Sequence, residues 1–403
     1  MTGILDSRYS WARLSISLLI AAVGNVGMWA LVVVLPLVEA EFGVDRSEAA
    51  LPYTATMIGF GLGNVLMGRV VDRIGVARAL SIAAVMISLG HVGAALAPSI
   101  IPMAIAQVVI GIGAATFFGP LIADISHWFM RRRGIAVGIV ASGNYLAGGL
   151  WPLVLSPILA MGDWRLAYWV IAVAVLVLVF PLALLLRRKL PADAHIVADQ
   201  VAAVRTQATR LSPLQLQLLL AVAGVACCVA MSMPQVHIVS FCVDLGYGPA
   251  VGAGMLSVML FAGVVSRLVS GLLADWLGGV RTLLIGSAGQ MLALALYLPS
   301  TGLTGLYLVS LIFGLSQGGI IPSYAIIVRE YLPAREAGQR IGMVIMATIF
   351  GMALGGWLTG WIYDQTGSYQ MAILNGIGWN AVNILIVLLV LGSTRKRREA
   401  LAA

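Results

Sequence analysis

The amino-acid sequence predicts an all-α integral membrane protein, with twelve transmembrane helices in two six-helix bundles. The first observation is composition: of 403 residues, 61% are hydrophobic and only 10% are charged, and the mean hydropathy is +1.00. Soluble domains carry about 25% charged residues. The second observation is a series of apolar runs, each near the roughly 20 residues that a helix needs to cross a bilayer. The third is a motif that occurs once in each half of the chain.

The apolar runs predict twelve spans in chain order, interrupted once by a polar stretch from Arg187 to Ser212. The first six are Ser15–Val38, Ala50–Gly68, Ala79–Ala97, Ile101–Ile125, Gly134–Leu159 and Leu166–Leu186. The second six are Leu214–Phe241, Val251–Gly271, Thr282–Pro299, Leu303–Ile327, Ile341–Ile362 and Met371–Leu391. We therefore expect an N-terminal bundle over residues 1–188, a cytoplasmic linker over 189–212, a C-terminal bundle over 213–394, and a basic tail over 395–403.

The distribution of Lys and Arg predicts that both termini are cytoplasmic, because basic residues concentrate in cytoplasmic loops. With the N-terminus inside, all 24 Lys and Arg residues lie on the cytoplasmic side except Arg46, Arg165 and the embedded Arg267. The net charge of +8 is then mostly an orientation signal and indicates no nucleic-acid partner. We expect a multi-pass protein of a bacterial-type cell inner membrane.

Arg267 is the one charge in the first twenty or so residues of the apolar stretch from Val251 to Gly278. Gly263, Arg267, Gly271 and Asp275 recur every four residues and so share one helix face, where small residues let a helix or ligand approach. The structural alternatives are an arginine that reaches the cytoplasmic surface, or one paired with a buried carboxylate. No Asp or Glu lies at mid-depth in another span, which favours a binding site for an anion.

Two segments form an internal repeat, 203 residues apart. Gly68-Arg69-Val70-Val71-Asp72-Arg73-Ile74-Gly75 follows the second span, and Gly271-Leu272-Leu273-Ala274-Asp275-Trp276-Leu277-Gly278 follows the eighth. The pattern resembles the major facilitator superfamily, whose signature between spans two and three reads G-x-L-A-D-R-x-G. The resemblance covers nearly the whole chain and implies two duplicated bundles. It also implies a cytoplasmic gate, to which we assign Asp72, Arg73, Asp275 and Arg131; a tight turn with no gating role is the alternative.

A narrower resemblance precedes and enters the fifth span. Trp128-Phe129-Met130-Arg131-Arg132-Arg133-Gly134-Ile135-Ala136-Val137-Gly138, continuing to Ser142-Gly143, is similar to the monocarboxylate-porter pattern [YW]-F-x-[KR]-[KR]-x-x-[LI]-A-x-G-x-A-x-[AS]-G. Arg267, with Gly271 and Asp275 after it, resembles the eighth span of monocarboxylate porters and oxalate:formate antiporters. In that family the arginine at this position binds the substrate carboxylate, which implies the same role for Arg267.

The chain departs from that family at three places. Animal monocarboxylate porters carry Asp four residues before the arginine, where this chain has Gly263, and they carry a lysine in the first span, which has no Lys or Arg between Ser15 and Leu37. The oxalate antiporters imply a second cation in span eleven, where Thr348 stands near the expected place. These departures leave the coupling ion and any dicarboxylate preference open.

Other polar residues near mid-span are candidates for substrate contact. Spans one, five, seven, eight, ten and eleven commonly face the cavity in this superfamily, which favours Asn25, Asn144, Tyr145 and Gln317; hydrogen bonding to a neighbouring helix is the alternative. Thr348 is a further candidate. His237 follows Met233-Pro234-Gln235, which can kink span seven, and it could contact the substrate or handle a proton.

The predicted function is secondary active transport of a small organic anion, foremost a monocarboxylate, by alternating access and linked to protons. The alternatives are anion exchange of the oxalate:formate type, drug export by the same fold, and a membrane sensor that does not transport. HExxH, GxSxG with partners, Walker and CxxC motifs are missing from the sequence, so we expect no enzyme activity, cofactor or metal. The expected partners of this monomer are the anion, protons and the lipid bilayer.

Overall fold

A computed structural model describes residues 5–129, 132–188, 211–300, 302–332 and 337–402. Within these residues the chain forms twelve helical spans, which confirms the all-α membrane fold. Several spans extend beyond the predicted apolar runs: the first covers Arg8–Phe42, because polar and charged residues continue the helix past the hydrophobic segment. The last helix likewise continues to Ala402, through residues that we expected to form a tail.

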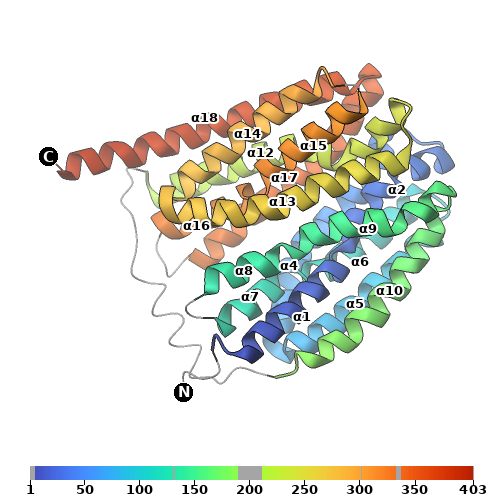
Figure 1. Cartoon of the computed structure of the whole chain (residues 1–403), viewed down its shortest axis with the longest axis horizontal. Helices are drawn as coiled ribbons and strands as arrows, with labels where there is room; N and C mark the ends of the chain where they lie inside the picture. Colours follow the sequence, from blue (N-terminus) through green and yellow to red (C-terminus); the bar gives the residue numbers. More distant parts are fainter. Residues whose placement is uncertain (1–4, 130–131, 189–210, 301, 333–336, 403) are drawn as a thin grey trace.

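The two halves of the sequence form two helical bundles that lie side by side (Figure 1). The first half contains α1 (Arg8–Gly24), α2 (Val26–Phe42), α3 (Arg46–Ala49), α4 (Leu51–Ile74), α5 (Val76–Ala95), α6 (Ile100–Ala115), α7 (Gly119–Trp128), α8 (Arg133–Ala141), α9 (Gly143–Ala160) and α10 (Trp164–Leu185). The second half contains α12 (Pro213–Asp244), α13 (Pro249–Leu277), α14 (Gly279–Tyr297), α15 (Leu303–Gln317), α16 (Ile320–Tyr331), α17 (Ala337–Thr366) and α18 (Tyr369–Ala402).

Both ends of the chain lie on the same side of the molecule (Figure 1), as an even number of spans requires. We call this side, where α1 begins and α4 and α13 end, the terminal side. We call the opposite side, where α2, α12 and α17 end, the distal side.

The repeat is visible in the backbone of the two turns that the shared motif predicts. Gly75 separates α4 from α5 with φ 86°, and Gly278 separates α13 from α14 with φ 81°. This left-handed conformation is easily adopted only by glycine. The same turn therefore follows the second span and the eighth.

Four spans that the sequence predicts as single helices are divided in two near their middle. α1 and α2 meet at Asn25, α8 and α9 at Ser142, and α15 and α16 at residues 318–319; the fourth break, between α6 and α7, lies at residues 116–118. Buried interruptions of this kind are tolerated where side chains or neighbouring helices satisfy the freed backbone groups. The Asn25 amide does so, because its Nδ2 donates to the carbonyls of Ala21 and Phe117.

The polar contacts between described residues of the two halves are unevenly distributed along the membrane axis. Among the hydrogen bonds and ion pairs that join described residues of the two halves, those of Arg46, Ser47 and Thr54 lie toward the distal side. One more, from Arg267, lies between these bonds and the terminal side. The conformation is therefore one in which the halves are fastened together at the distal side.

Candidate substrate-binding site

Arg267 lies inside the protein, between the two halves. Its side chain is 6% exposed, and it donates from Nη1 to the carbonyl of Ala141 at 2.6 Å and from Nε to the carbonyl of Gly318 at 3.2 Å. Ala141 ends α8 in the first half, and Gly318 follows α15 in the second. The guanidinium therefore links two helix breaks, one from each half.

Glycine residues bring α15 close enough to α13 for this contact. A Cβ on Gly318 would overlap the carbonyl oxygen of Gly263, and one on Gly314 would overlap the carbonyl oxygen of Met259. Close approach of helix backbones through small residues is typical of membrane proteins. The break after Gln317 thus places a free carbonyl beside Arg267.

Tyr145 of α9 lies against the guanidinium. The Arg267 Cζ is 4.1 Å from the centroid of the Tyr145 ring, within the range of a cation–π interaction. A Cβ on Gly263 would lie 2.9 Å from that ring, so only glycine leaves room for it. Gly263 stands where animal monocarboxylate porters carry an aspartate, and here an aromatic ring occupies the adjoining space.

Arg267 has no carboxylate partner among the residues that the structure describes. The ion pairs of the described residues are Arg13–Asp124, Arg46–Glu39, Arg46–Asp244 and Arg165–Glu41. The hydrogen bonds of Arg267 to backbone carbonyls use Nε and Nη1, and Tyr145 is its side-chain partner among the described residues. Both structural alternatives, an arginine that reaches the cytoplasmic surface and an arginine paired with a buried carboxylate, are thereby disfavoured. The buried positive charge of Arg267 is therefore not neutralised by a described carboxylate.

Two polar groups beside Arg267 in the fold are buried without a hydrogen-bond partner. These are the Oγ of Ser266 and the Nε2 of Gln317. Gln317 accepts a hydrogen bond from Gln235 of α12 through its Oε1, so its amide is held while Nε2 remains unused. Buried polar groups are almost always paired, so these two unpaired groups, next in the chain to Arg267 and Gly318, are available for a further hydrogen bond. The sequence did not indicate Ser266 or Gln235, because a pattern of apolar runs does not show which helix faces pack together.

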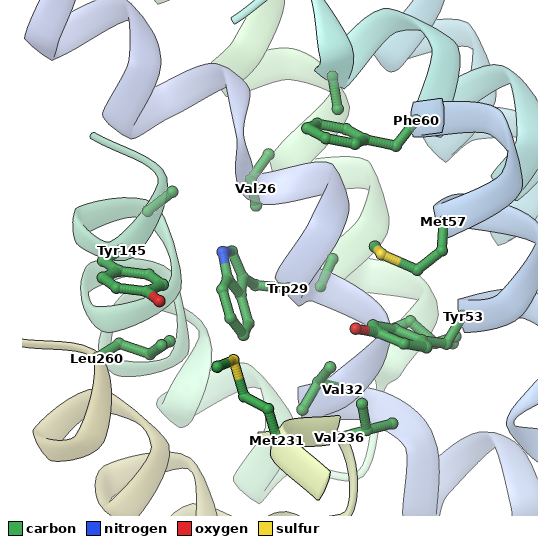
Figure 2. Close-up of a cluster of buried hydrophobic side chains, with 14 of the residues drawn as sticks. Val26, Trp29, Val32, Tyr53, Met57, Phe60, Tyr145, Met231, Val236 and Leu260 are labelled. Atoms are coloured by element: carbon green, nitrogen blue, oxygen red, sulfur yellow. The ribbon is translucent and has the colours of Figure 1, made fainter. Parts of the chain in front are cut away.

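Figure 2 shows apolar side chains from both halves around Tyr145, the residue whose ring lies against Arg267. Trp29 of α2 lies close to Tyr145 in this view, with Leu260 and Met231 of the second half below them. The Trp29 indole is fixed because its Nε1 donates to the Asn144 carbonyl and, at 2.8 Å, to the Asn144 Oδ1. The predicted residues Tyr145 and Asn144 therefore belong to this region, Asn144 by orienting Trp29.

The structure places Asn25, Thr348 and His237 in other contacts. Asn25 joins the breaks of spans one and four, as described above. The Thr348 Oγ1 donates to the carbonyl of Ile345 in its own helix. None of the three hydrogen-bonds to Arg267, and their contact with a substrate stays a prediction.

A second buried arginine, Arg46, fastens the distal side. It is 7% exposed and pairs with Asp244 at 2.6 Å and with Glu39 at 3.0 Å. The carboxylate of Asp364 accepts from the backbone N–H groups of Arg46 and Ser47 at 2.9 and 2.8 Å. Since Arg46 and Glu39 belong to the first half and the two aspartates to the second, we call Arg46, Glu39, Asp244 and Asp364 the distal latch.

His237 is connected to the distal latch through Tyr369 of α18. The His237 Nδ1 is 3.3 Å from the Tyr369 Oη, and its Nε2 is 2.8 Å from the carbonyl oxygen of Gly356 in α17. The Arg46 Nη1 donates to the same Tyr369 hydroxyl at 3.0 Å. A buried imidazole and the latch arginine thus share one hydroxyl group.

The predicted gate on the terminal side is only partly described. Asp72 and Arg73 are exposed at the end of α4, and neither takes part in the ion pairs found between described residues. Arg131 and the side chain of Asp275 lie outside the described part of the chain. Asp72 also lines a cavity of about 1210 Å³ in the first half, together with Arg13, Arg78 and Asp124 among others. The gating role of all four residues stays a prediction.

Twelve spans in two similar halves, closed at one side around a buried polar centre, define a membrane transport protein. The family profile described as Major Facilitator Superfamily matches residues 17–324 and 294–403. The chain therefore belongs to the major facilitator superfamily, a family of secondary transporters rather than enzymes.

Curated relatives include proteins from animals, fungi and bacteria. Monocarboxylate transporter 13 of Bos taurus is 30% identical over 266 residues, which covers 66% of this chain and 61% of that protein. The chain thus spans about three fifths of the length of this animal relative. The uncharacterized MFS-type transporter YcxA of Bacillus subtilis is 25% identical over 388 residues and covers 91% of each chain. MFS-type transporter 1 of Ophiocordyceps sp. is 25% identical over 315 residues, 76% of this chain and 68% of that one.

Solved structures share the fold at low sequence identity. A POT family transporter in complex with 5-aminolevulinic acid has a TM-score of 0.75 at 14% identity, over 98% of each chain. A bacterial homologue of the human lysosomal transporter Spinster, in an inward-facing and occupied conformation, has a TM-score of 0.68 at 15% identity, over 95% of this chain and 96% of that one. These similarities support the fold alone.

Proposed function

We propose that this protein is a secondary active transporter of a small monocarboxylate, with Arg267 as the anchor for the carboxylate. The observation that carries the proposal is a buried guanidinium held by two backbone carbonyls and a tyrosine ring, with no described carboxylate to neutralise it. Arg267 can add a charge-assisted hydrogen bond to a carboxylate, and the planar guanidinium suits a planar anion.

The surroundings of Arg267 favour one carboxylate and an apolar remainder. The buried arginines of the described residues are Arg13, Arg46 and Arg267, and the first two already have carboxylate partners. One available cation matches one negative charge. Trp29, Met231 and Leu260 would enclose the rest of the molecule, and the relative named monocarboxylate transporter 13 supports this class of substrate.

Alternating access would move the substrate past this site. With both termini cytoplasmic, as the basic residues predict, the distal latch closes the extracellular side, so this conformation would face inward. The outward-facing state then requires Arg46 to leave Asp244 and Asp364. We propose that transport is linked to protons, with anion exchange as the competing mechanism.

Uptake and ligand binding by purified protein test the proposal. Acetate, lactate and benzoate should raise the unfolding temperature, because ligands that bind the folded state stabilise it; the corresponding amides, which carry no charge, should not. At least one of these acids should enter proteoliposomes, and Arg267→Gln should reduce both signals to background while the variant still folds and inserts. Carboxylate transport by Arg267→Gln near the parental rate would remove Arg267 from the mechanism. Stabilisation by cationic or neutral compounds alone would overturn the substrate class.

A further inference from the structure

We propose that His237 carries the transported proton and that Tyr369 couples it to the distal latch. The second half would then exchange one positive charge for another: Arg46 when the latch is closed, or a proton on His237 when it is open. This inference rests on the proposed proton-linked transport and names the group that performs the coupling.

The hydrogen bonds around His237 fit a neutral imidazole with its hydrogen on Nε2. The Gly356 carbonyl can only accept, so the Nε2 that lies 2.8 Å from it must donate. The Tyr369 hydroxyl already accepts from the Arg46 Nη1, which leaves its own hydrogen free to be donated to the His237 Nδ1. With the latch closed, each nitrogen of the ring therefore has a matched partner, and there is no place for a second proton.

Adding that proton would disturb the closed latch directly. A hydrogen on Nδ1 would face the Tyr369 hydroxyl, which must then turn its own hydrogen away. The imidazolium would also stand one hydroxyl group from the Arg46 guanidinium. Like charges at this separation, buried from water, repel more strongly than at a surface. Protonation of His237 therefore favours the release of Arg46.

The charges of the second half explain why a proton can replace Arg46. His237 lies in α12, in the field of Asp244 at the end of the same helix, of Asp364 in α17, and of Arg46. The remaining groups around the shared hydroxyl are Glu39 and Tyr363, both of which contact Arg46. When the latch opens, Arg46 and Glu39 leave with the first half. The two aspartates then keep one compensating cation only if His237 is protonated.

The proton balance follows from this exchange. With the latch open, a proton from the distal aqueous phase bonds to the lone pair of Nδ1. As the latch closes, Arg46 returns and the N–H bond breaks. The ring keeps the electron pair, and the proton passes to the bound carboxylate or to water between the halves. No oxidant, metal or further reactant is required.

Two other possible proton carriers, Asp124 and His91, lack a comparable link between the halves. Asp124 accepts two hydrogen bonds from Arg13 at 2.9 Å, within the first half. His91 bonds to the Ile87 carbonyl and packs on Tyr168, also within the first half. His237 is equally buried, yet it reaches the inter-half contact through a single hydroxyl.

The test separates coupling from binding in proteoliposomes that contain the full chain. Uphill uptake of lactate into buffer-loaded vesicles under a one-unit pH gradient measures coupling, and a one-proton mechanism should give about tenfold accumulation. Exchange of labelled for unlabelled lactate at equal pH measures carboxylate binding and reorientation alone. The Gln side chain can keep the bonds to Gly356 and Tyr369 without titrating. We therefore expect His237→Gln to retain exchange within about threefold of the parent and to lose the accumulation.

His91→Gln is the matched control, because that histidine has the same burial and lies within one half; it should retain both activities. Accumulation by His237→Gln at the parental level would overturn the inference. If His237→Gln does not fold, Tyr369→Phe tests the coupling instead. Loss of the hydroxyl should abolish the dependence of lactate accumulation on the pH gradient. A pH dependence equal to that of the parent would overturn the coupling. A parent protein that exchanges lactate but never accumulates it would contradict this inference while leaving the Arg267 site intact. A parent with neither activity would instead refute the proposed function.

Discussion

Arg46 and Arg267 are buried to nearly the same extent, at 7% and 6% exposure, yet their surroundings differ in kind. Arg46 has Glu39 and Asp244 as ion-pair partners, and two tyrosine rings lie beside it. Arg267 has two neutral carbonyls and one ring. A buried charge is tolerated when its partners neutralise it. The comparison indicates that Arg46 is neutralised by carboxylates of the protein, whereas Arg267 has no carboxylate partner among the described residues.

In the proposed mechanism, the two arginines therefore contribute to different steps of transport. Breaking the pairs of Arg46 requires a change in conformation, so this arginine can define a state. Filling the site at Arg267 requires a ligand, so that arginine can define a substrate. Mutation of Arg46 should therefore change the balance between conformations, and mutation of Arg267 should change the affinity for the substrate.

The largest effect is expected for Arg267→Lys. Lysine keeps the charge but cannot hold both carbonyls and a carboxylate at once, and charge-assisted hydrogen bonds contribute about 1.5–3 kcal/mol each. Affinity for the transported monocarboxylate should fall roughly 10- to 100-fold, as measured by calorimetry. Arg281→Lys, at an exposed arginine in the first turn of α14, should bind as the parent does. Parental affinity in Arg267→Lys would show that charge alone matters and that the comparison is wrong.

Arg46→Ala should produce a change of comparable size, in conformation rather than in intrinsic affinity. Removing one partner of a buried pair costs about 3 kcal/mol or more, which would shift the balance between states roughly 100-fold toward the state with an open distal side. The measurement is labelling of Val236→Cys, in the central cluster of Figure 2, by a membrane-impermeant maleimide added from the distal side. The natural cysteines Cys227, Cys228 and Cys242 would first be replaced by alanine. Labelling that does not increase would mean that the latch does not hold the closed state.

Gly263→Ala should have a smaller effect, because it disturbs the ring beneath Arg267 and not the charge. Its Cβ would lie 2.9 Å from Tyr145, and overpacking of this kind costs about 1–3 kcal/mol. We expect a lower unfolding temperature and weaker carboxylate binding. The control is Gly271→Ala in the same helix, where a Cβ meets nothing within 4 Å. Equal behaviour of the two variants would show that the close fit of Tyr145 is unimportant.

Asp72→Asn should have the smallest effect, opposite in direction to that of Arg46→Ala. Asp72 is exposed and makes no ion pair with a described residue in this conformation, so any gating contact would form only in the other state. Such surface pairs contribute about 0.2–1 kcal/mol, so the population should move at most about fivefold toward the present state. Reduced distal-side labelling of Val236→Cys would report this. Unchanged labelling would leave the loop as a turn without a gating role.

The sequence predicted best those features that depend on a single strong effect, the burial of apolar residues in the membrane. Burial of Arg267 could be predicted because an arginine flanked by some twenty apolar residues has no other place to lie. The twelve spans followed from hydropathy for the same reason. The midpoint breaks were not predicted, since at Asn25 and Ser142 the local residues also suit a continuous helix and only contacts with distant helices reveal the break.

The distal latch was missed because its parts are far apart in the chain. Arg46 is separated from Asp244 by 198 residues, and hydropathy counts it only as a loop charge. A usable signal did exist. Spans one, seven and eleven each end in an acidic residue on the side that carries Arg46, which is one of only two arginines predicted to lie there. Opposite charges at the ends of non-adjacent spans can mark where two bundles close.

The hydrogen bond from Arg267 to the Ala141 carbonyl has a mechanical consequence. It joins the halves between the fastened distal side and the terminal side, which is the interval that contains the axis about which two rocking bodies would turn. Atoms near such an axis move least when the bodies rotate. A solute held there would keep its position while the passage opens first above it and then below it. A single guanidinium near this axis could then bind the substrate throughout the transport cycle, and a second binding residue would not be needed.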